Sequence, residues 1–264
     1  MSRFLLMIGT AALTLTALAG CQPGGSSRAA EATRARSEVA AYVPSMARFD
    51  LPPDGRGEAP VSFQFGAAYG VPVAGDWDGD GFDSVGIFFP GQGRFFLTNE
   101  NAGGFAEIAL SFGEFPGKVH PVAGDWHGTG KMTVGVYQPE EGRFLLRSGR
   151  SEASPVEEVR FGPKKRSLLP VAGDWDGDGR TDVGVYDPDS GVFTLSVNGQ
   201  ERARPFGSRG GVPLAGDWLG TGRWDVGILD RRAGEVSLRL KASETKRLPF
   251  RSPVAIPLAG RWRR

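Results

Sequence analysis

A four-residue motif, Ala-Gly-Asp-Trp, recurs along this chain and constrains its fold more than any other feature. Complete copies begin at Ala74, Ala123, Ala172 and Ala215, and an altered copy, Ala-Gly-Arg-Trp, begins at Ala259. Successive copies are separated by 49, 49, 43 and 44 residues. A period of about 40–50 residues suits one small antiparallel sheet per repeat, as in the blades of a β-propeller.

Each repeat contains four short apolar segments separated by turn signals. In the third repeat these segments are residues 169–174, 183–186 and 192–195 and a run ending at Phe206-Gly207. The Asp-Pro-Asp-Ser-Gly sequence at residues 187–191 has the composition of a hairpin turn. In the first repeat, residues 106–112 alternate apolar and polar side chains, as a half-buried strand does. The chain is therefore predicted to be all-β, with four antiparallel strands in each blade.

The two ends of the chain predict how the ring closes. The fifth repeat stops after its first strand, at residues 257–262, and would leave an unpaired sheet edge. Near the N-terminus, residues 35–44 align without a gap on residues 179–188 of the third repeat. We therefore expect a five-bladed propeller whose last blade combines the C-terminal strand with N-terminal strands at residues 39–42, 48–51 and 61–65.

The N-terminal region resembles the leader of a bacterial lipoprotein. Arg3 precedes an apolar run at residues 4–19, and the sequence Leu-Ala-Gly before Cys21 is similar to a lipobox. This resemblance implies cleavage before Cys21 and attachment of acyl chains such as palmitate, whereas the alternative is a free cysteine inside an ordinary secretion signal. We expect a signal peptide at residues 1–20, a flexible tether at 21–36 and a single propeller domain at 37–264.

The leader also predicts a location, and the charge balance limits the partners. A lipid anchor on Cys21 would hold the protein at the membrane of a bacterial cell envelope, and Gln22 favours the outer membrane in a Gram-negative host. The 31 Lys and Arg residues nearly balance the 30 Asp and Glu residues. Binding to nucleic acid or to an anionic membrane surface depends on clustered cations, so neither is expected as the main partner.

The loop after the third Ala-Gly-Asp-Trp has the pattern of a calcium site. Oxygen ligands at alternating positions of a Gly-containing turn suit a hard cation that takes six to eight oxygens. The predicted ligands are the carboxylates of Asp174, Asp176, Asp178 and Asp182 and the backbone carbonyl of Arg180. The alternative is a turn rich in Asp and Gly that binds no ion.

The first repeat predicts a second, weaker calcium site. Its candidate ligands are Asp76, Asp78, Asp80, Phe82, Asp83 and Ser84. The last acid of this loop, Asp83, falls one position early, so either Asp83 reaches the ion or Ser84 and a water substitute. The second and fourth repeats have lost all but the first acid at the ligand positions within the turn and are not expected to bind calcium. Calcium is thus expected to stiffen loops rather than to act in catalysis.

The repeated Trp and the residues before it predict how the blades pack. We expect each Trp to act as a wedge between adjacent blades, in preference to an exposed crown of rings that stacks on sugars. The Ala and Gly that precede it in every copy are expected to line a narrow central channel, where bulky residues would not fit.

At these loops the chain resembles the FG-GAP or VCBS repeat family, which includes integrin α-subunit propellers and many secreted bacterial proteins. The resemblance covers about residues 38–262 and rests on the Asp-x-Asp-Gly-Asp-Gly loop of the first and third repeats. It implies structural calcium ions and a propeller that serves adhesion, recognition of proteins or glycans, or scaffolding. Five blades rather than seven, and three loops without the acids, separate this chain from the integrin pattern.

The sequence favours binding over catalysis. The only histidines are His120 and His127, and the single Cys is assigned to lipidation, so no nucleophile–base pair is evident. The favoured hypothesis is a non-catalytic scaffold that binds cell-envelope proteins. The alternatives are a lectin-like binder of polysaccharide and, less favoured, a polysaccharide-degrading enzyme. Trp224, the one Trp outside the repeated set, is a candidate partner contact or a buried support for its loop.

Overall fold

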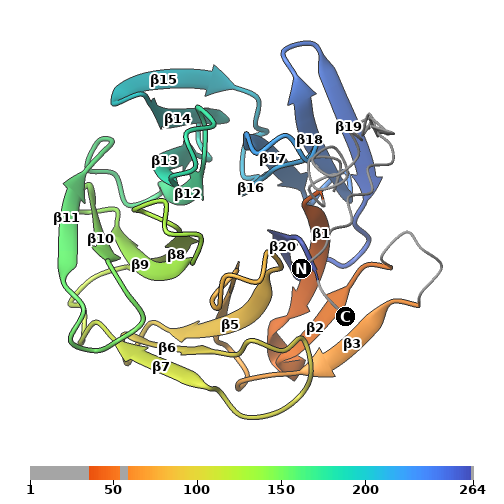
Figure 1. The fold of residues 1–264 in the computed structure, drawn as a ribbon. Helices are drawn as coiled ribbons and strands as arrows, with labels where there is room; N and C mark the ends of the chain where they lie inside the picture. Colours follow the sequence, from red (N-terminus) through yellow and green to blue (C-terminus); the bar gives the residue numbers. More distant parts are fainter. Residues whose placement is uncertain (1–35, 54–58, 263–264) are drawn as a thin grey trace, which may run out of the picture. The chain divides into compact units, whose positions relative to one another are not determined.

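The computed structural model describes residues 36–53 and 59–262, which form five four-stranded antiparallel sheets around a central axis (Figure 1). Blade 1 contains β4 (Val71–Gly75), β5 (Ser84–Phe89), β6 (Arg94–Leu97) and β7 (Ile108–Ser111). Blade 2 contains β8 (His120–Gly124), β9 (Thr133–Gln138), β10 (Arg143–Arg147) and β11 (Val156–Arg160). Blade 3 contains β12 (Leu169–Gly173), β13 (Asp182–Asp187), β14 (Val192–Val197) and β15 (Gln200–Pro205). Blade 4 contains β16 (Val212–Gly216), β17 (Asp225–Asp230), β18 (Glu235–Lys241) and β19 (Glu244–Pro249).

Blade 5 joins the two ends of the propeller. Its strand order is β20-β1-β2-β3, with β20 at Ile256–Gly260, β1 at Glu38–Val43, β2 at Arg48–Leu51 and β3 at Val61–Gln64. A short 3₁₀ helix, η1 (Pro44–Met46), connects β1 to β2. Strands β1 and β20 pair antiparallel from Glu38 opposite Gly260 to Tyr42 opposite Ile256. The prediction of five blades, with the last one shared between the chain ends, is confirmed.

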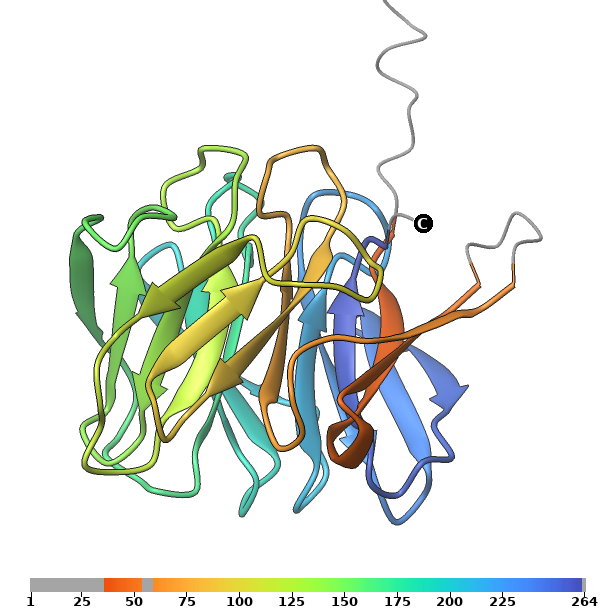
Figure 2. The ribbon, with the colours of Figure 1, turned by 90° about the horizontal axis from the view of Figure 1, so that it is seen from below.

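The first strand of each blade faces the axis. Strands β4, β8, β12, β16 and β20 contact one another in sequence, and β20 contacts β4, which completes the ring (Figures 1 and 2). Each of these strands contributes consecutive Pro, Val or Leu, and Ala residues to the wall of the central channel. The expectation that Ala lines the channel is therefore confirmed, but the channel also carries larger apolar side chains.

Each repeated Trp packs where two blades meet. Trp77 lies in one cluster with Phe88 and Phe95 of its own blade and with Val134 and Val136 of blade 2. The other four occupy equivalent clusters between successive blades; Trp175, Trp218 and Trp262 are buried and Trp126 is partly buried. The prediction of a wedge between blades is confirmed.

The Gly before each Trp has a different role from the one the sequence predicted. A Cβ atom added to Gly75 would lie 2.7 Å from the Trp77 ring, closer than packed carbon atoms approach. The equivalent Gly124, Gly173, Gly216 and Gly260 are covered by their own Trp rings in the same way. This Gly is absent from the channel lining. It is required because the wedge folds back onto its backbone.

A repeated backbone hydrogen bond links neighbouring blades at each of these junctions. At each junction the donor is the backbone N–H of the residue just before the second strand of one blade. The acceptor is the carbonyl of the residue just after the inner strand of the preceding blade. The five pairs, with N–O distances of 2.7–2.9 Å, are Met132–Asp76, Thr181–Asp125, Trp224–Asp174, Ser37–Asp217 and Asp83–Arg261. The blades are therefore joined by a polar contact as well as by apolar packing.

The side chains at these junctions fall into two classes. Thr181, Ser37 and Asp83 each accept a second hydrogen bond, from the backbone N–H of the same Asp or Arg, at 2.9, 3.0 and 2.6 Å. At the other two junctions, which follow the two acid-rich loops, Met132 and Trp224 stand in this position. The two apolar junctions are thus those next to the acid-rich loops, and the other three are polar.

Removal of residues 256–264 should abolish the cooperative unfolding transition of the domain. This change removes β20 and Trp262, which leaves β1 without its inner partner and opens the ring. Loss of the Trp wedge alone corresponds to about 3–5 kcal/mol. Urea denaturation, monitored by Trp fluorescence and by circular dichroism, would test whether the transition is lost. The control is a chain that lacks only residues 263–264, and a shorter chain that unfolds like the control would contradict ring closure.

His120, the first residue of β8, should make the domain sensitive to mild acid. Burial, aided by Lys118, lowers its pKa from 6.5 to about 4, because the charged imidazolium loses hydration. Above pH 6.5 the imidazole is neutral in both states and its contribution to stability is complete. As the pH falls towards 4, the unfolded chain takes up the proton first and stability decreases.

A His120→Asn variant should therefore lose less stability than the parent between pH 7 and pH 5. Denaturant midpoints of both proteins would be measured at pH 7 and at pH 5. The other titrating groups are the same in both proteins, so their contributions cancel in the comparison. Equal changes for the two proteins would show that His120 does not contribute.

Candidate metal sites

The first Asp of each loop closes that loop through backbone hydrogen bonds. The Asp174 carboxylate accepts the N–H of Gly177 at 2.6 Å and of Gly179 at 2.9 Å. Asp76 accepts the equivalent N–H groups of Gly79 and Gly81 at 2.6 and 2.8 Å. Asp125 and Asp217 also accept two backbone N–H groups each, but from the residues four and five positions on, which are Thr129 and Gly130 and Thr221 and Gly222. This Asp therefore has a structural role in all four loops, including the two without further acids.

Two loops bring three carboxylates together. Ligand-type oxygens of Asp76, Asp78 and Asp80 all lie within 4.8 Å of one another, and the same holds for Asp174, Asp176 and Asp178. The two glycines of each loop, which precede and follow its third Asp, have φ values of 82–92°, a backbone region that favours Gly and permits the tight turn. Both groups have the oxygen chemistry that Ca²⁺ and similar hard cations require, and both could hold a metal ion.

Asp182 supports a cation in the blade 3 loop. It is partly buried, and its Oδ2 atom is buried without a hydrogen-bond partner. Burial, together with repulsion from the nearby Asp176, raises the pKa of Asp182 to about 7. A carboxylate in such a setting needs either a proton or a positive charge. A bound cation would supply that charge, so the residues present fit the predicted ion.

Blade 4 shows how the same position is stabilised without a metal. Asp225 stands where blade 3 has Asp182, and Arg204 donates to its Oδ1 at 2.6 Å. Arg239 forms a second ion pair with its Oδ2. The fourth loop has Thr221 in place of the third acid of the blade 3 loop. In blade 4, two guanidinium groups balance the charge of Asp225, whereas in blade 3 a bound cation would balance that of Asp182. The contrast strengthens the assignment of the cation to blade 3.

The blade 1 loop differs from that of blade 3 at its fourth acid. Asp83 is displaced by one residue, and a shift of one residue along an extended chain turns a side chain to the opposite face. Its Oδ2 accepts the backbone N–H of Arg261 at 2.6 Å, and the side chain lines the central channel. Ser84 occupies the ligand position, where its Oγ donates to the carbonyl of Asn99 at 2.9 Å. Ser84 lines the same cavity as Asp78 and Asp80, whereas Asp83 lines the channel; which of them completes a calcium site stays a prediction.

The blade 1 loop also opens onto a cavity of about 540 Å³. Its polar lining is preorganised, because Asn99 donates to Glu107 at 2.6 Å and Asn101 donates to the carbonyl of Asp83 at 2.9 Å. The cavity is lined by Asp78, Asp80, Phe82, Ser84, Asn99, Glu100, Asn101, Ala102 and Glu107. In blade 3, by contrast, the hairpin residue Asn198 donates its N–H to Asp176 at 3.2 Å.

The remaining candidate residues have definite places. Arg180 and Phe82 lie in their loops and donate their N–H groups to Asp178 and Asp80, so their roles as carbonyl ligands stay predictions. Trp224 is partly buried, packs against the cluster around Trp175 and lines the channel. This arrangement matches the support role more closely than a freely exposed contact.

The predicted lipidation site and leader lie outside the described residues. Cys21, the signal peptide at 1–20 and most of the tether at 21–36 belong to this part of the chain. In the ranges 36–53 and 59–262, no helix has the length and apolar character to span a membrane.

No protein-family model matches the chain, and no curated protein matches it. The similarity to FG-GAP and VCBS repeats therefore consists of the loop motif and the propeller fold.

Replacement of Asp182 by Asn should uncouple the domain from calcium. In chelator, the variant should melt at a higher temperature than the parent, because an unpaired buried charge is removed. The stabilisation that calcium gives the parent, about 2.7 kcal/mol at a concentration 100 times Kd, should be largely lost. Thermal melts in millimolar calcium and in chelator would measure both effects.

Asp225→Asn is the matched control, since it changes the equivalent position in blade 4. It should lower stability by about 1.5–3 kcal/mol in both conditions, because two charged hydrogen bonds are lost. Its response to calcium should equal that of the parent. A calcium response unchanged in Asp182→Asn would contradict the site.

Proposed function

We propose that this protein is a calcium-stabilised, lipid-anchored β-propeller of the bacterial cell envelope that binds other envelope proteins and catalyses no reaction. The motif similarity to FG-GAP and VCBS repeats and the lipobox-like sequence before Cys21 support the anchor and the location. The rigid ring and its two acid-rich loops support a role in presenting a fixed binding surface. On this proposal, calcium holds the loops of blades 1 and 3 in shape.

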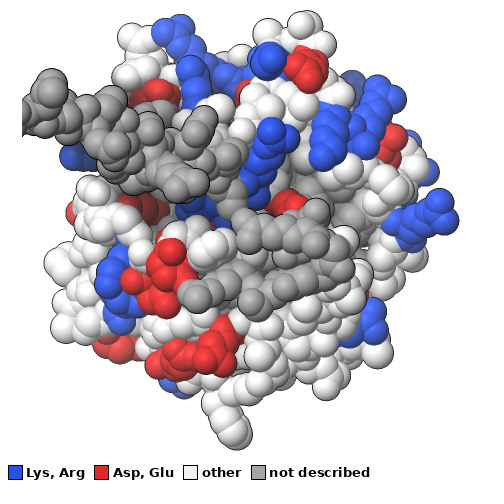
Figure 3. Space-filling model, turned by 45° about the vertical axis from the view of Figure 1, so that its right-hand side comes forward, with Lys and Arg blue, Asp and Glu red and all other residues white. Residues whose placement is uncertain are grey.

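The uneven distribution of charge carries the proposal of a protein partner. Residues 71–160, which form blades 1 and 2, contain 13 Asp and Glu residues but seven Lys and Arg residues. Residues 200–262 contain 12 Lys and Arg residues and six Asp and Glu residues. Figure 3 shows Lys and Arg mostly in the upper and right-hand parts of one face, and clusters of Asp and Glu towards the lower left. The near-zero net charge therefore conceals two regions of opposite sign.

Such segregation suits recognition of another protein. Complementary potentials accelerate association and fix the orientation of partners. The outer strand of blade 4, β19, is exposed along most of its length and carries Lys246 and Arg247. The nearby Arg231, Arg232 and Arg251 are exposed as well. An acidic surface on an envelope protein is the partner chemistry that this basic region favours.

The cavity beside the blade 1 loop favours a second candidate function, recognition of a polysaccharide. Its volume of about 540 Å³ lies within the range of small-molecule sites. Carboxylate and amide groups line it, and such groups bind sugar hydroxyls. Phe105, on the same loop as Asn99 and Asn101, is 98% exposed and offers a ring for stacking.

The test is a crosslinking pull-down of the natively acylated, C-terminally tagged protein from its own membranes. We expect recovery of a specific envelope protein. Lys246→Glu should reduce the recovery several-fold, and so should salt at about 1 M, where charges are screened within about 3 Å. Lys118→Glu is the matched control, because Lys118 is also an exposed lysine but precedes β8 in the acidic half.

The outcomes separate the two functions. Recovery that Lys246→Glu and Lys118→Glu affect equally would contradict the basic surface as the contact. Recovery of polysaccharide without protein, in calcium and not in chelator, would support the second function instead. Recovery of neither would overturn the binding proposal.

A further inference from the structure

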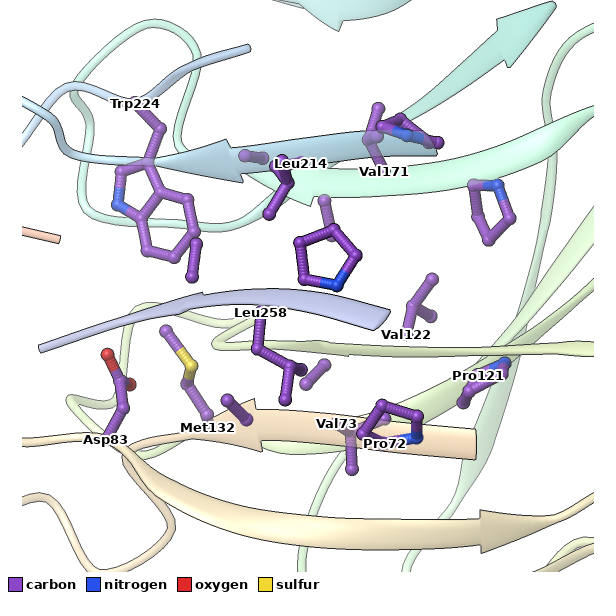
Figure 4. Close-up of a pocket in the computed structure, with 18 residues that line it drawn as sticks. Pro72, Val73, Asp83, Pro121, Val122, Met132, Val171, Leu214, Trp224 and Leu258 are labelled. Atoms are coloured by element: carbon purple, nitrogen blue, oxygen red, sulfur yellow. The ribbon is translucent and has the colours of Figure 1, made fainter. Parts of the chain in front are cut away.

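One end of the central channel combines three side chains that the repeat does not require. The channel has a volume of about 180 Å³, and the inner strands supply its apolar wall of Pro, Val, Leu and Ala side chains. Asp83, Met132 and Trp224 complete the lining. Figure 4 shows Asp83 and Met132 on one side of this end and Trp224 on the opposite side. Asp83 is therefore the single charged side chain among the residues that line the channel.

The Asp83 carboxylate exceeds what its blade junction needs. Asp83 is 3% exposed, and its Oδ2 makes the junction hydrogen bond to Arg261. At two equivalent junctions the neutral hydroxyls of Ser37 and Thr181 do the same. The second oxygen, Oδ1, is buried without a hydrogen-bond partner. The charge of Arg261 also attracts this carboxylate, but it leaves Oδ1 without a donor. Because a buried oxygen without a hydrogen bond is costly, and because this oxygen belongs to an anion, the geometry points to a cationic hydrogen-bond donor.

The other groups at this end select the kind of cation. A hard metal ion takes six or more oxygen ligands, which one carboxylate in an apolar wall does not provide. The face of the Trp224 ring attracts organic cations. A quaternary ammonium has no N–H to donate to Oδ1, whereas a primary ammonium has three. The Val and Leu side chains along the channel suit an aliphatic chain attached to that ammonium.

We propose that this end of the channel binds a primary alkylammonium group. The ammonium donates to the Asp83 carboxylate beside the Trp224 ring, and its aliphatic chain lies along the channel between Val73, Leu214 and Leu258. Because Oδ1 is buried, a neighbouring side chain has to move, and the unbranched Met132 is the most adaptable one at this end. The ammonium comes either from a free alkylamine or from a lysine side chain of a bound protein. This proposal is argued without the calcium sites and without the basic surface of blade 4.

The test is calorimetric titration of the full-length protein with n-butylammonium chloride. We expect saturable binding, and at least tenfold weaker binding of n-butanol, which lacks the charge, and of tetramethylammonium, which lacks the donors. Asp83→Ser places the residue of an equivalent junction at this site, so the variant should fold and bind at least tenfold more weakly. Trp224→Leu should weaken binding as well. Thr181→Ser, at an equivalent junction outside the channel lining, should bind like the parent.

Two further probes distinguish the sources of the ammonium. Binding of Nα-acetyl-lysine amide, abolished by acetylation of its side-chain amine, would assign the site to a lysine of a partner. Binding of n-butylammonium alone would assign it to a free amine. A parent protein that shows no saturable binding of n-butylammonium overturns the proposal, and so does an Asp83→Ser variant that binds it like the parent.

Discussion

The packing of one Trp between each pair of blades is the interaction on which the rest of the structure depends. The ring folds back over the Gly of its own strand and contacts the second strand of the next blade, as Trp77 contacts Val134 and Val136. The rings bury a large apolar area at each junction and fix the spacing of the inner strands. Because the first Asp of each acid-rich loop lies between the Gly and the Trp, the same packing determines where the loop carboxylates lie.

The loops show that the turn does not require the acidic group of a candidate metal site. The first Asp holds the backbone of all four loops by two hydrogen bonds, of which the one from the N–H five residues on is common to all, so the outer acids are free to change. Where they are absent, blade 4 balances the remaining carboxylate with Arg204 and Arg239. Where they are present, Asp182 has no such partner. The acidic groups that could hold a metal ion therefore belong to individual blades, whereas the fold belongs to the repeat.

Much of the fold followed from the sequence, because a period and a closing strand are visible in it. The repeat spacing predicted the blades, and the alignment of residues 35–44 on a complete repeat predicted the closure. The two groups of three acids were also predictable, because all members of each group lie in one short turn of the sequence.

Contacts between repeats were not predictable from the sequence. Asp83 and Ser84 are adjacent in the sequence, yet one faces the channel and the other the metal loop, and only the start of β5 decides which. The Gly two residues before each Trp was assigned to the channel because the sequence does not show which way the Trp ring points. Its contact with that ring was therefore not visible. The partners of Asp225 come from two different blades, and no spacing rule connects them.

The shared fifth blade has a consequence for synthesis of the chain. Strands β1, β2 and β3 emerge from the ribosome first, but the inner strand of their sheet, β20, emerges almost two hundred residues after β3. Throughout that interval the inner edge of β1 remains without its partner. An unpaired edge of this kind readily associates with other chains, and pairing between such distant segments is slow. The nascent protein therefore has the greatest need of chaperone protection before its last strand is made.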